Sequence, residues 1–171
     1  MQALLSELSP VQAIQPEHRC ERFDCGTPDL NEWLKRHALQ SHRSDAARTF
    51  VVHQNLEVKA YYALVSGDVS RRDSPSRLGS GLGNYPIPII LLARLAVDLS
   101  FQKRGLGKAL LKDAMLRVIR VAEDVAVRAL VVDAIDDQAK RYYVEAGFVP
   151  FPEDQMRLAV MLKDLRVSTK S

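Results

Sequence analysis

The sequence predicts an α/β fold in a single domain, and three observations lead to this prediction. Helical and extended segments alternate along the chain without an internal repeat. A long apolar, β-branched run at 87–97 precedes a glycine loop and a segment of helical periodicity. The chain has 171 residues, 47% of them hydrophobic, which suffices for one buried core but is short for two. We therefore expect one domain over residues 1–171.

The first half of the chain predicts a helix, a hairpin and a long loop. Thr27 and Pro28 are typical of an N-cap and a first helical position, and the helix is expected to continue through DLNEWLKRHALQ. TFVVHQ and VKAYYALVS are β-rich runs, separated by a hairpin-like break at 55–57. Residues 71–86, RRDSPSRLGSGLGNYP, predict a loop of a length that is uncommon unless functional or mobile. A disordered connector is the alternative for this loop.

The second half predicts three strands and two helices. IPIILLARLAV indicates a central strand buried on both faces. From Gly105 onward, apolar residues recur at helical spacing as far as Val125. VRALVVDAI predicts another buried strand, and DDQAKRYYVEAGF a short helix with Asp136 as its N-cap and Gly147 as its stop. RLAVMLKDL predicts the last strand.

Composition excludes several classes of protein. Cys20 and Cys25 are too few for a disulfide framework or a Cys-type zinc site, and the four histidines show no ligand spacing, so we expect free thiols and no metal. The N-terminus lacks the pattern of a signal peptide, and no apolar run approaches the roughly 20 residues that span a bilayer. We therefore expect a cytoplasmic protein that does not associate with membranes.

The glycine loop QKRGLGKAL predicts a phosphate site. Its two glycines allow a tight turn and a close approach of the backbone to a ligand, at a helix N-terminus whose dipole favours an anion. The loop is not a Walker A motif, because Gln102 stands at the position of its first glycine and Ala109 at its last position. An ordinary strand-to-helix turn is the alternative.

Two motifs resemble the GNAT superfamily of acetyltransferases. Gln102-x-x-Gly105-x-Gly107 after LLARLAV is similar to the family's acetyl-CoA pyrophosphate loop, and AKRYYVEAGF resembles its A-x-x-x-Y-x-x-x-G-F pattern. The resemblance implies the GNAT fold, a mixed twisted sheet flanked by helices, with acetyl-CoA as cosubstrate between strands ending near Val97 and Ala134. The residues implied in acetyl-CoA binding are Leu95, Val97, Gln102, Lys103, Arg104, Gly105, Leu106, Gly107 and Lys108.

A narrower likeness, over about residues 18–165, is to the acetyltransferase toxins of bacterial toxin–antitoxin pairs. TFVV, PIPIILLARLAVDLSFQKRGLG and KRYYVEAGF carry it. It implies acetylation of the α-amine of aminoacyl-tRNA, arrest of translation, a ribbon-helix-helix antitoxin and, as a family expectation, a homodimer. The chain departs from the family in two places: the hairpin break contains no glycine, and the first 17 residues have no counterpart.

Tyr143 is the candidate catalytic residue, because it takes the tyrosine position of the family pattern. A phenol with a pKa of ~10 can protonate a departing thiolate, whose thiol has a pKa of ~8.5, and remains protonated at neutral pH. Core packing is the alternative role for Tyr143, and the adjacent Tyr142 is the rival candidate. No Glu or Asp stands out as a general base.

Four cations are candidate substrate contacts. Arg94 lies inside an apolar strand, where a cation is costly unless it is paired or faces a cavity, so it forms either a salt bridge or a substrate contact. Arg48, Lys35 and Arg36 could line a path for tRNA phosphates or form a solvated basic face. Two other functions stay open: acetylation of a small amine or a protein N-terminus, and a non-enzymatic CoA-bound module that complexes an antitoxin and operator DNA.

Overall fold

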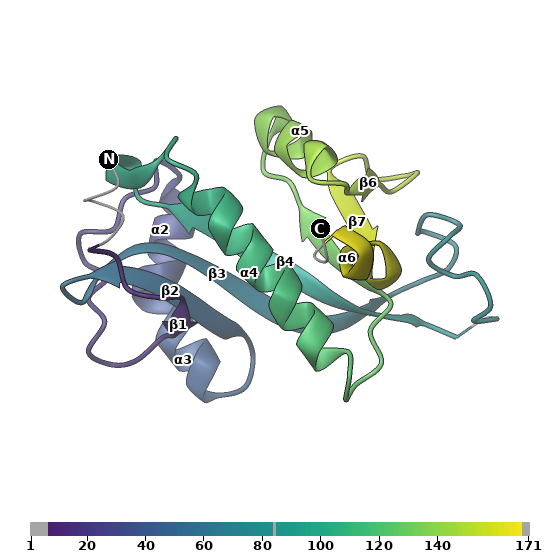
Figure 1. Ribbon diagram of the computed structural model, residues 1–171, viewed down its shortest axis with the longest axis horizontal. Helices are drawn as coiled ribbons and strands as arrows, with labels where there is room; N and C mark the ends of the chain where they lie inside the picture. Colours follow the sequence, from purple (N-terminus) through teal and green to yellow (C-terminus); the bar gives the residue numbers. More distant parts are fainter. Residues whose placement is uncertain (1–6, 84, 169–171) are drawn as a thin grey trace. The chain divides into compact units, whose positions relative to one another are not determined.

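The computed structural model describes residues 7–83 and 85–168 and confirms a mixed α/β architecture (Figure 1). The strands form one sheet in the order β1-β2-β3-β4-β5-β7-β6. Of the pairings described, β4 with β5 is parallel, and β1–β2, β2–β3, β5–β7 and β6–β7 are antiparallel. In chain order the elements are β1 (Gln12–Ala13), α2 (Pro28–Arg36), α3 (Ala38–Arg43), β2 (Arg48–Gln54), β3 (Glu57–Val69), β4 (Ile87–Val97), a 3-10 turn η1 (Leu99–Phe101), α4 (Leu106–Val121), β5 (Ala129–Asp133), α5 (Asp137–Glu145), β6 (Val149–Pro150), β7 (Arg157–Met161) and α6 (Leu162–Ser168).

The chain divides into two compact units. The first comprises residues up to Val65 together with Arg94–Ala114, and the second comprises Ser66–Ala93 and residues from Met115 on. β3, β4 and α4 each have residues in both units. Each unit has an apolar core of its own. The single domain over 1–171 stays a prediction.

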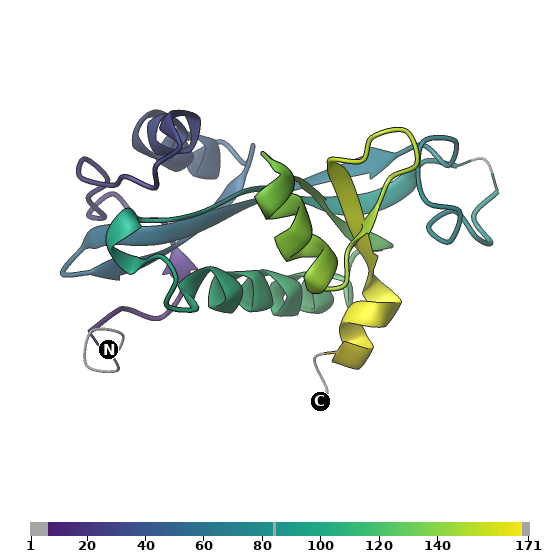
Figure 2. The ribbon, with the colours of Figure 1, turned by 90° about the horizontal axis from the view of Figure 1, so that it is seen from above.

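The core of the first unit is aromatic and lies against the β2–β3 hairpin. Tyr61 is fully buried on β3 and meets Phe23 edge to face, and its hydroxyl donates to the carbonyl of Leu30 at 2.7 Å. Leu34 and Ala38 are buried as the apolar face of the first predicted helix requires. Within this unit, α2 and α3 lie on one face of the hairpin and the first half of α4 on the other (Figure 2).

The hairpin break forms without glycine. Asn55 and Leu56 both adopt positive φ, 51° and 69°, as the two central residues of a type I′ turn must. Asparagine tolerates this conformation, whereas leucine does so at a cost of about 1 kcal/mol. Arg19 supports the turn, because its guanidinium donates to the Asn55 carbonyl at 2.7 Å.

Four predictions about elements need correction. The helix after Thr27 breaks at His37, and α3 follows in a new direction that lets His42 Nδ1 accept from the Thr49 N–H at 3.0 Å. The C-terminal half of β4 is mostly half-buried, so β4 is not buried on both faces throughout. α4 ends at Val121, because tight turns follow over the acidic pair at 123–124, and acidic residues are unfavourable at a helix C-terminus. Val125 lies beyond the helix and is 62% exposed. LKDL is not strand but the start of α6, which buries Leu162 and Leu165 at helical spacing.

Other predicted boundaries are confirmed. Pro28 starts α2 after an extended Thr27, although the Thr27 side chain makes no capping hydrogen bond. The loop over 71–86 lies between β3 and β4 in its described part, and Asn84 falls outside the described residues. The two-residue edge strands β1 and β6 were not predicted.

Acid is expected to destabilise the fold through His18. The side chain is buried, and its Nδ1 accepts from the Gln15 N–H at 2.9 Å. Burial, aided by the neighbouring His53 ring, lowers the pKa of His18, with Glu17 opposing. Because the unfolded chain then binds a proton more readily than the folded one, stability should fall as the pH drops below about 6.5, by at most about 1.4 kcal/mol per pH unit for this group.

Urea titrations between pH 8 and 5 would measure this slope. His18→Asn, whose amide oxygen can replace Nδ1 as acceptor, should flatten it. An identical pH dependence in the wild type and in His18→Asn would contradict the assignment.

Candidate active site

The glycine loop between η1 and α4 has the backbone of an anion site. Gly105 has φ of 84° and its carbonyl accepts from the Ala109 N–H at 3.0 Å, so it caps α4. The next three N–H groups, of Leu106, Gly107 and Lys108, lie in the first turn and have no partner within the helix. Lys103 also has positive φ, at 62°. The left-handed residues Lys103 and Gly105 turn the chain into α4, and free N–H groups at a helix N-terminus favour an anion.

Gln102 fixes the loop in place. Its Nε2 donates to the carbonyls of Val97, at 2.8 Å, and Cys25, at 2.9 Å. The first residue of the Gln-x-x-Gly-x-Gly motif therefore ties the loop to the end of β4 and to the segment before α2. Asp98 adds a second tie, since its Oδ1 accepts from the Asp24 N–H at 2.9 Å and its Oδ2 caps η1 at Ser100. These hydrogen bonds anchor the loop to the end of β4 and to the segment before α2.

The side chains of the loop suit a pyrophosphate. Lys103 and Lys108 are exposed, and Arg104 lies over the ring of Phe101, 5.6 Å from its centroid. Leu106 is buried, so its contribution to a ligand would be its N–H. A Cβ placed on Gly107 would lie 3.6 Å from Val97 Cγ2, so its lack of a side chain is not forced by packing. The donors and charges present therefore fit the diphosphate of acetyl-CoA.

The end of β4 supplies Leu95 and Val97. The parallel register with β5 runs from Ile89↔Ala129 to Leu92↔Val132, whereas β4 itself continues to Val97. The Asp98 N–H donates to the Lys59 carbonyl on β3 at 2.8 Å. Because neighbouring residues of a strand point to opposite edges, the N–H groups of Leu95 and Val97 point away from β3.

Tyr143 lies on α5, whose two ends are set as predicted. Asp136 accepts from the Ala139 N–H at 2.7 Å, and Gly147, with φ of 104°, ends the helix. The Tyr143 ring is 8% exposed and meets the rings of Tyr142 and Phe148, each at 5.4 Å between centroids. Burial, reinforced by Tyr142, raises the pKa of Tyr143 well above that of a free phenol. The hydroxyl is therefore a proton donor at every physiological pH.

The rival Tyr142 has a different environment. Its hydroxyl oxygen is buried and has no hydrogen-bond partner among the described residues, and burial raises its pKa as well. Both tyrosines are thus protonated, and their pKa values do not distinguish them. The catalytic role of Tyr143 stays a prediction.

Arg94 contacts an aromatic ring, a partner that neither predicted role, salt bridge or substrate contact, included. Its guanidinium lies over the Trp33 ring, 4.2 Å from the centroid, and Trp33 stacks on Tyr61 at 6.0 Å. Burial lowers the pKa of Arg94, and Tyr61 has the opposite effect on it. The guanidinium nevertheless stays charged at neutral pH. Trp33 and Tyr61 were not predicted beside Arg94, because only the fold brings these aromatic rings to it.

Removing the Arg94 charge should loosen this stack. Arg94→Met keeps much of the apolar stem and loses the cation–π contact, at an expected cost of about 0.5–2 kcal/mol in the free energy of unfolding. Trp33 is the only tryptophan, so its fluorescence should report the change directly. Urea denaturation followed by that fluorescence measures both effects, and an unchanged midpoint and spectrum would contradict the stack.

The other predicted substrate contacts lie on two elements of the first unit. Arg48, at the start of β2, pairs with Asp45 at 2.5 Å and donates to the His42 carbonyl at 2.8 Å. Arg36 on α2 pairs with Glu32 at 2.7 Å, and Lys35 beside it is exposed. Both arginine side chains remain more than half exposed. Exposed ion pairs of this kind are weak and can exchange for phosphate.

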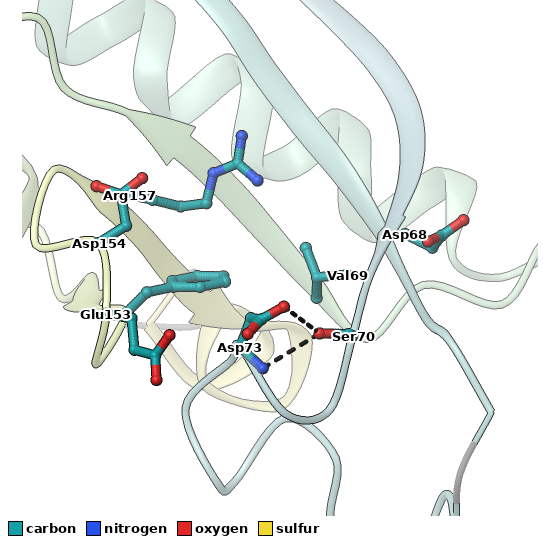
Figure 3. A pocket seen from close by; sticks show the side chains of 8 residues that line it. Asp68, Val69, Ser70, Asp73, Glu153, Asp154 and Arg157 are labelled. Carbon is teal, nitrogen blue, oxygen red and sulfur yellow. Dashed lines mark hydrogen bonds between the residues drawn. The ribbon is translucent and has the colours of Figure 1, made fainter.

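A cavity of about 390 Å³ in the second unit is unsuited to phosphate (Figure 3). Asp68, Asp73, Glu153 and Asp154 line it, with Phe151 buried at its wall. Arg157, the one cation among its described lining residues, donates two hydrogen bonds of 2.7 and 2.9 Å to Asp133. The acidic lining excludes this cavity as the pyrophosphate site.

Thiol and metal chemistry find little support in the described part of the chain. Cys20 and Cys25 are free thiols. Burial is the main cause that raises the pKa of Cys20 to about 11, and it also raises the pKa of Cys25. Neither is a thiolate nucleophile at neutral pH. Among residues 7–83 and 85–168, no group of three or more His, Cys, Asp or Glu side chains is placed to hold a metal ion. None of the described helices is long and apolar enough to cross a membrane.

Comparison with known proteins places these features in a family. The model of the acetyltransferase (GNAT) domain matches residues 84–162. The chain is 40% identical to the tRNA-acetylating toxin of Mycobacterium tuberculosis over 162 residues, which cover 95% of this chain and 97% of the relative.

Two solved structures of the toxin AtaT superpose on the whole fold. AtaT complexed with acetyl-methionyl-tRNAfMet has a TM-score of 0.86 at 28% identity, covering 95% of this chain and 99% of AtaT. A tyrosine-to-phenylalanine mutant of AtaT, bound to the C-terminus of the antitoxin AtaR and acetyl-CoA, has a TM-score of 0.82 at 26% identity, covering 96% and 99%. This chain therefore belongs to the GNAT family of acetyltransferases, together with these acetyltransferase toxins.

Proposed function

We propose that this chain is a toxin that transfers the acetyl group of acetyl-CoA to the α-amine of aminoacyl-tRNA and so blocks translation. The observation that carries the proposal is the anchored glycine loop at the N-terminus of α4, in a chain that is 40% identical to a tRNA-acetylating toxin along nearly its whole length. Acetylation removes the nucleophilic amine on which peptide-bond formation or initiation depends.

The glycine loop and the end of β4 would bind acetyl-CoA. The N–H groups of Leu106, Gly107 and Lys108 would donate to the pyrophosphate, with Lys103 and Arg104 adding positive charge. When bound, acetyl-CoA supplies an acetyl group activated as a thioester. An N–H of Leu95 or Val97 would polarise its carbonyl, because these groups point to the edge of β4 away from β3.

Tyr143 would act as the general acid. As the amine nitrogen forms its bond to the acetyl carbon, the carbon–sulfur bond breaks, and the phenol gives its proton to the departing sulfur. The raised pKa of Tyr143 keeps that proton available. The resulting Tyr143 phenolate then takes up the proton that the amine loses, either directly or through solvent.

The acceptor chemistry favours an α-amine. With a pKa of about 7.7 to 8.0, an appreciable fraction of α-amine is neutral near pH ~7.5, so no dedicated base is required. A lysine side chain, with a pKa of ~10.4, is neutral a few hundredfold less often. Arg48, Lys35 and Arg36 would contact the tRNA backbone, and Arg94 would contact the substrate near the acceptor amine. Such contacts should make activity fall with salt.

The partners follow from the same assignment. We expect a ribbon-helix-helix antitoxin that neutralises the chain, a cytoplasmic location and a homodimer. Acetylation of a small amine or a protein N-terminus is the second candidate. A non-enzymatic module that complexes antitoxin and operator DNA is the third.

Parallel rate measurements separate these candidates. Initial rates of CoA release should be measured with aminoacyl-tRNA, with a polyamine and with a peptide bearing a free N-terminus. We expect turnover with aminoacyl-tRNA that decreases with salt. Faster turnover on the polyamine or peptide would favour the second candidate, and CoA release with none of the three would favour the third.

A further inference from the structure

A second cavity, of about 340 Å³, lies in the second unit and has a charge opposite to that of the acidic cavity. Its walls come from the start of β4, the segment before β5, the end of β7 and the start of α6. Apolar atoms of Leu82, Pro88 and Met161 face it, and Leu82 and Met161 also pack on the core of this unit while remaining partly exposed. The cavity is therefore an opening in the surface beside the apolar core.

Backbone hydrogen bonds hold this cavity in shape. The Arg128 N–H donates to the Pro88 carbonyl at 2.8 Å, and the Leu162 N–H donates to the Arg128 carbonyl at 2.9 Å. These bonds join β4, the segment before β5 and α6 at the cavity wall. A ligand would thus meet a preformed site and would not have to order these segments.

The rim carries three positive charges. Arg128, Lys163 and Arg166 line the cavity, and no acidic side chain is among its described lining residues. Asp164, next to Lys163 on α6, pairs instead with Arg77 at 3.3 Å. Apolar walls with a cationic rim fit a ligand that combines an apolar group with nearby carboxylates or phosphates.

The lining distinguishes a peptide from RNA. Single-stranded RNA is held through aromatic rings on which bases stack, together with cations on the phosphates. Among the described residues that line this cavity there is no aromatic ring, and the apolar side chains are aliphatic. An aliphatic side chain flanked by Glu or Asp uses both the walls and the rim, whereas RNA would use the rim alone.

We infer that this cavity docks an acidic segment of the antitoxin, with one aliphatic side chain between Leu82 and Met161 and flanking carboxylates on Lys163, Arg166 and Arg128. The inference rests on the proposed function for the identity of the partner. The related AtaT is bound by the C-terminus of its antitoxin, so a C-terminal segment is the occupant that we expect. The acidic cavity, with four carboxylates, would repel the same segment.

Fluorescence anisotropy with the full-length chain tests the inference. The probe is a fluorescein-labelled peptide in which one leucine is flanked by glutamates, the chemistry that the walls and rim of the cavity should bind. Lys163→Glu combined with Arg166→Glu should weaken binding by about tenfold or more, because both attractions become repulsions.

Ala126→Trp, at an exposed lining position, should weaken binding by filling the cavity without a change of charge. Lys112→Glu with Arg120→Glu on α4 is the charge-matched control, since both residues are exposed and neither lines the cavity.

Acetylation of aminoacyl-tRNA by the same variants, without peptide, separates this inference from the proposed function. We expect wild-type rates in that assay together with lost peptide binding. Full peptide affinity in both cavity variants, or no binding of the peptide to the wild type, would overturn the inference while tRNA acetylation stands. A loss of tRNA binding in Lys163→Glu/Arg166→Glu with peptide binding intact would assign the cavity to RNA and also overturn it.

Discussion

Tyr143→Phe is expected to lower kcat for acetyl transfer by about 100- to 10,000-fold, the usual contribution of a general acid. The change removes the one proton donor that we assign to the departing thiolate. It keeps the ring that contacts Tyr142 and Phe148, so the free energy of unfolding should change by less than about 1 kcal/mol. Steady-state kinetics with acetyl-CoA and charged tRNA, together with urea denaturation, measure both quantities.

Tyr142→Phe is the matched control for this prediction. It deletes a neighbouring hydroxyl that is buried without a partner among the described residues, so stability should hold or rise slightly. Its kcat should stay near that of the wild type. A reversal, with Tyr142→Phe inactive and Tyr143→Phe active, would show that the acid is Tyr142.

Gly107→Asp is expected to raise KM for acetyl-CoA by about 10- to 100-fold, corresponding to about 1.4–2.7 kcal/mol. The carboxylate would lie in the first turn of α4, where the diphosphate should bind, and would repel it. The fold should tolerate the change, because a Cβ here makes only an ordinary contact with Val97 and an acidic side chain is favourable at a helix N-terminus.

Gly107→Asn separates charge from shape at the same position. It has nearly the same volume as aspartate without the charge, so KM should rise much less than in Gly107→Asp. Saturation kinetics in acetyl-CoA provide the measurement. Equal KM values for the two variants would mean that bulk, and not anionic repulsion, disrupts the site, and an unchanged KM in both would remove the pyrophosphate from this loop.

Local signals made much of the fold predictable. α5 begins after Asp136 and ends at Gly147 as expected, because a side-chain cap and a positive φ depend on neighbouring residues alone. The glycine loop was likewise visible, since its turn and helix start are encoded within a few residues. The Glu32–Arg36 pair was a missed local signal, because its i,i+4 spacing alone indicates an ion pair.

Features that depend on distant residues could not be predicted. Arg94 was expected to form a salt bridge or a substrate contact, and the fold brings it the Trp33 ring from α2. The Gln102 amide finds the Cys25 carbonyl only once the loop and the segment before α2 are in place. LKDL continues an apolar run, and no glycine or proline marks the change from β7 to α6. The hydrophobic pattern therefore predicted a strand there.

The central claim is that the acceptor is the α-amine of aminoacyl-tRNA, and the attachment point of the label tests it most directly. Radiolabelled acetyl-CoA is incubated with the chain and either charged or deacylated total tRNA, and the products are digested with nuclease and separated. We predict label in N-acetyl-aminoacyl-adenosine from charged tRNA only, at an initial rate that falls by about 100-fold or more with Tyr143→Phe. Label on deacylated tRNA, or none on any charged tRNA, would contradict the claim.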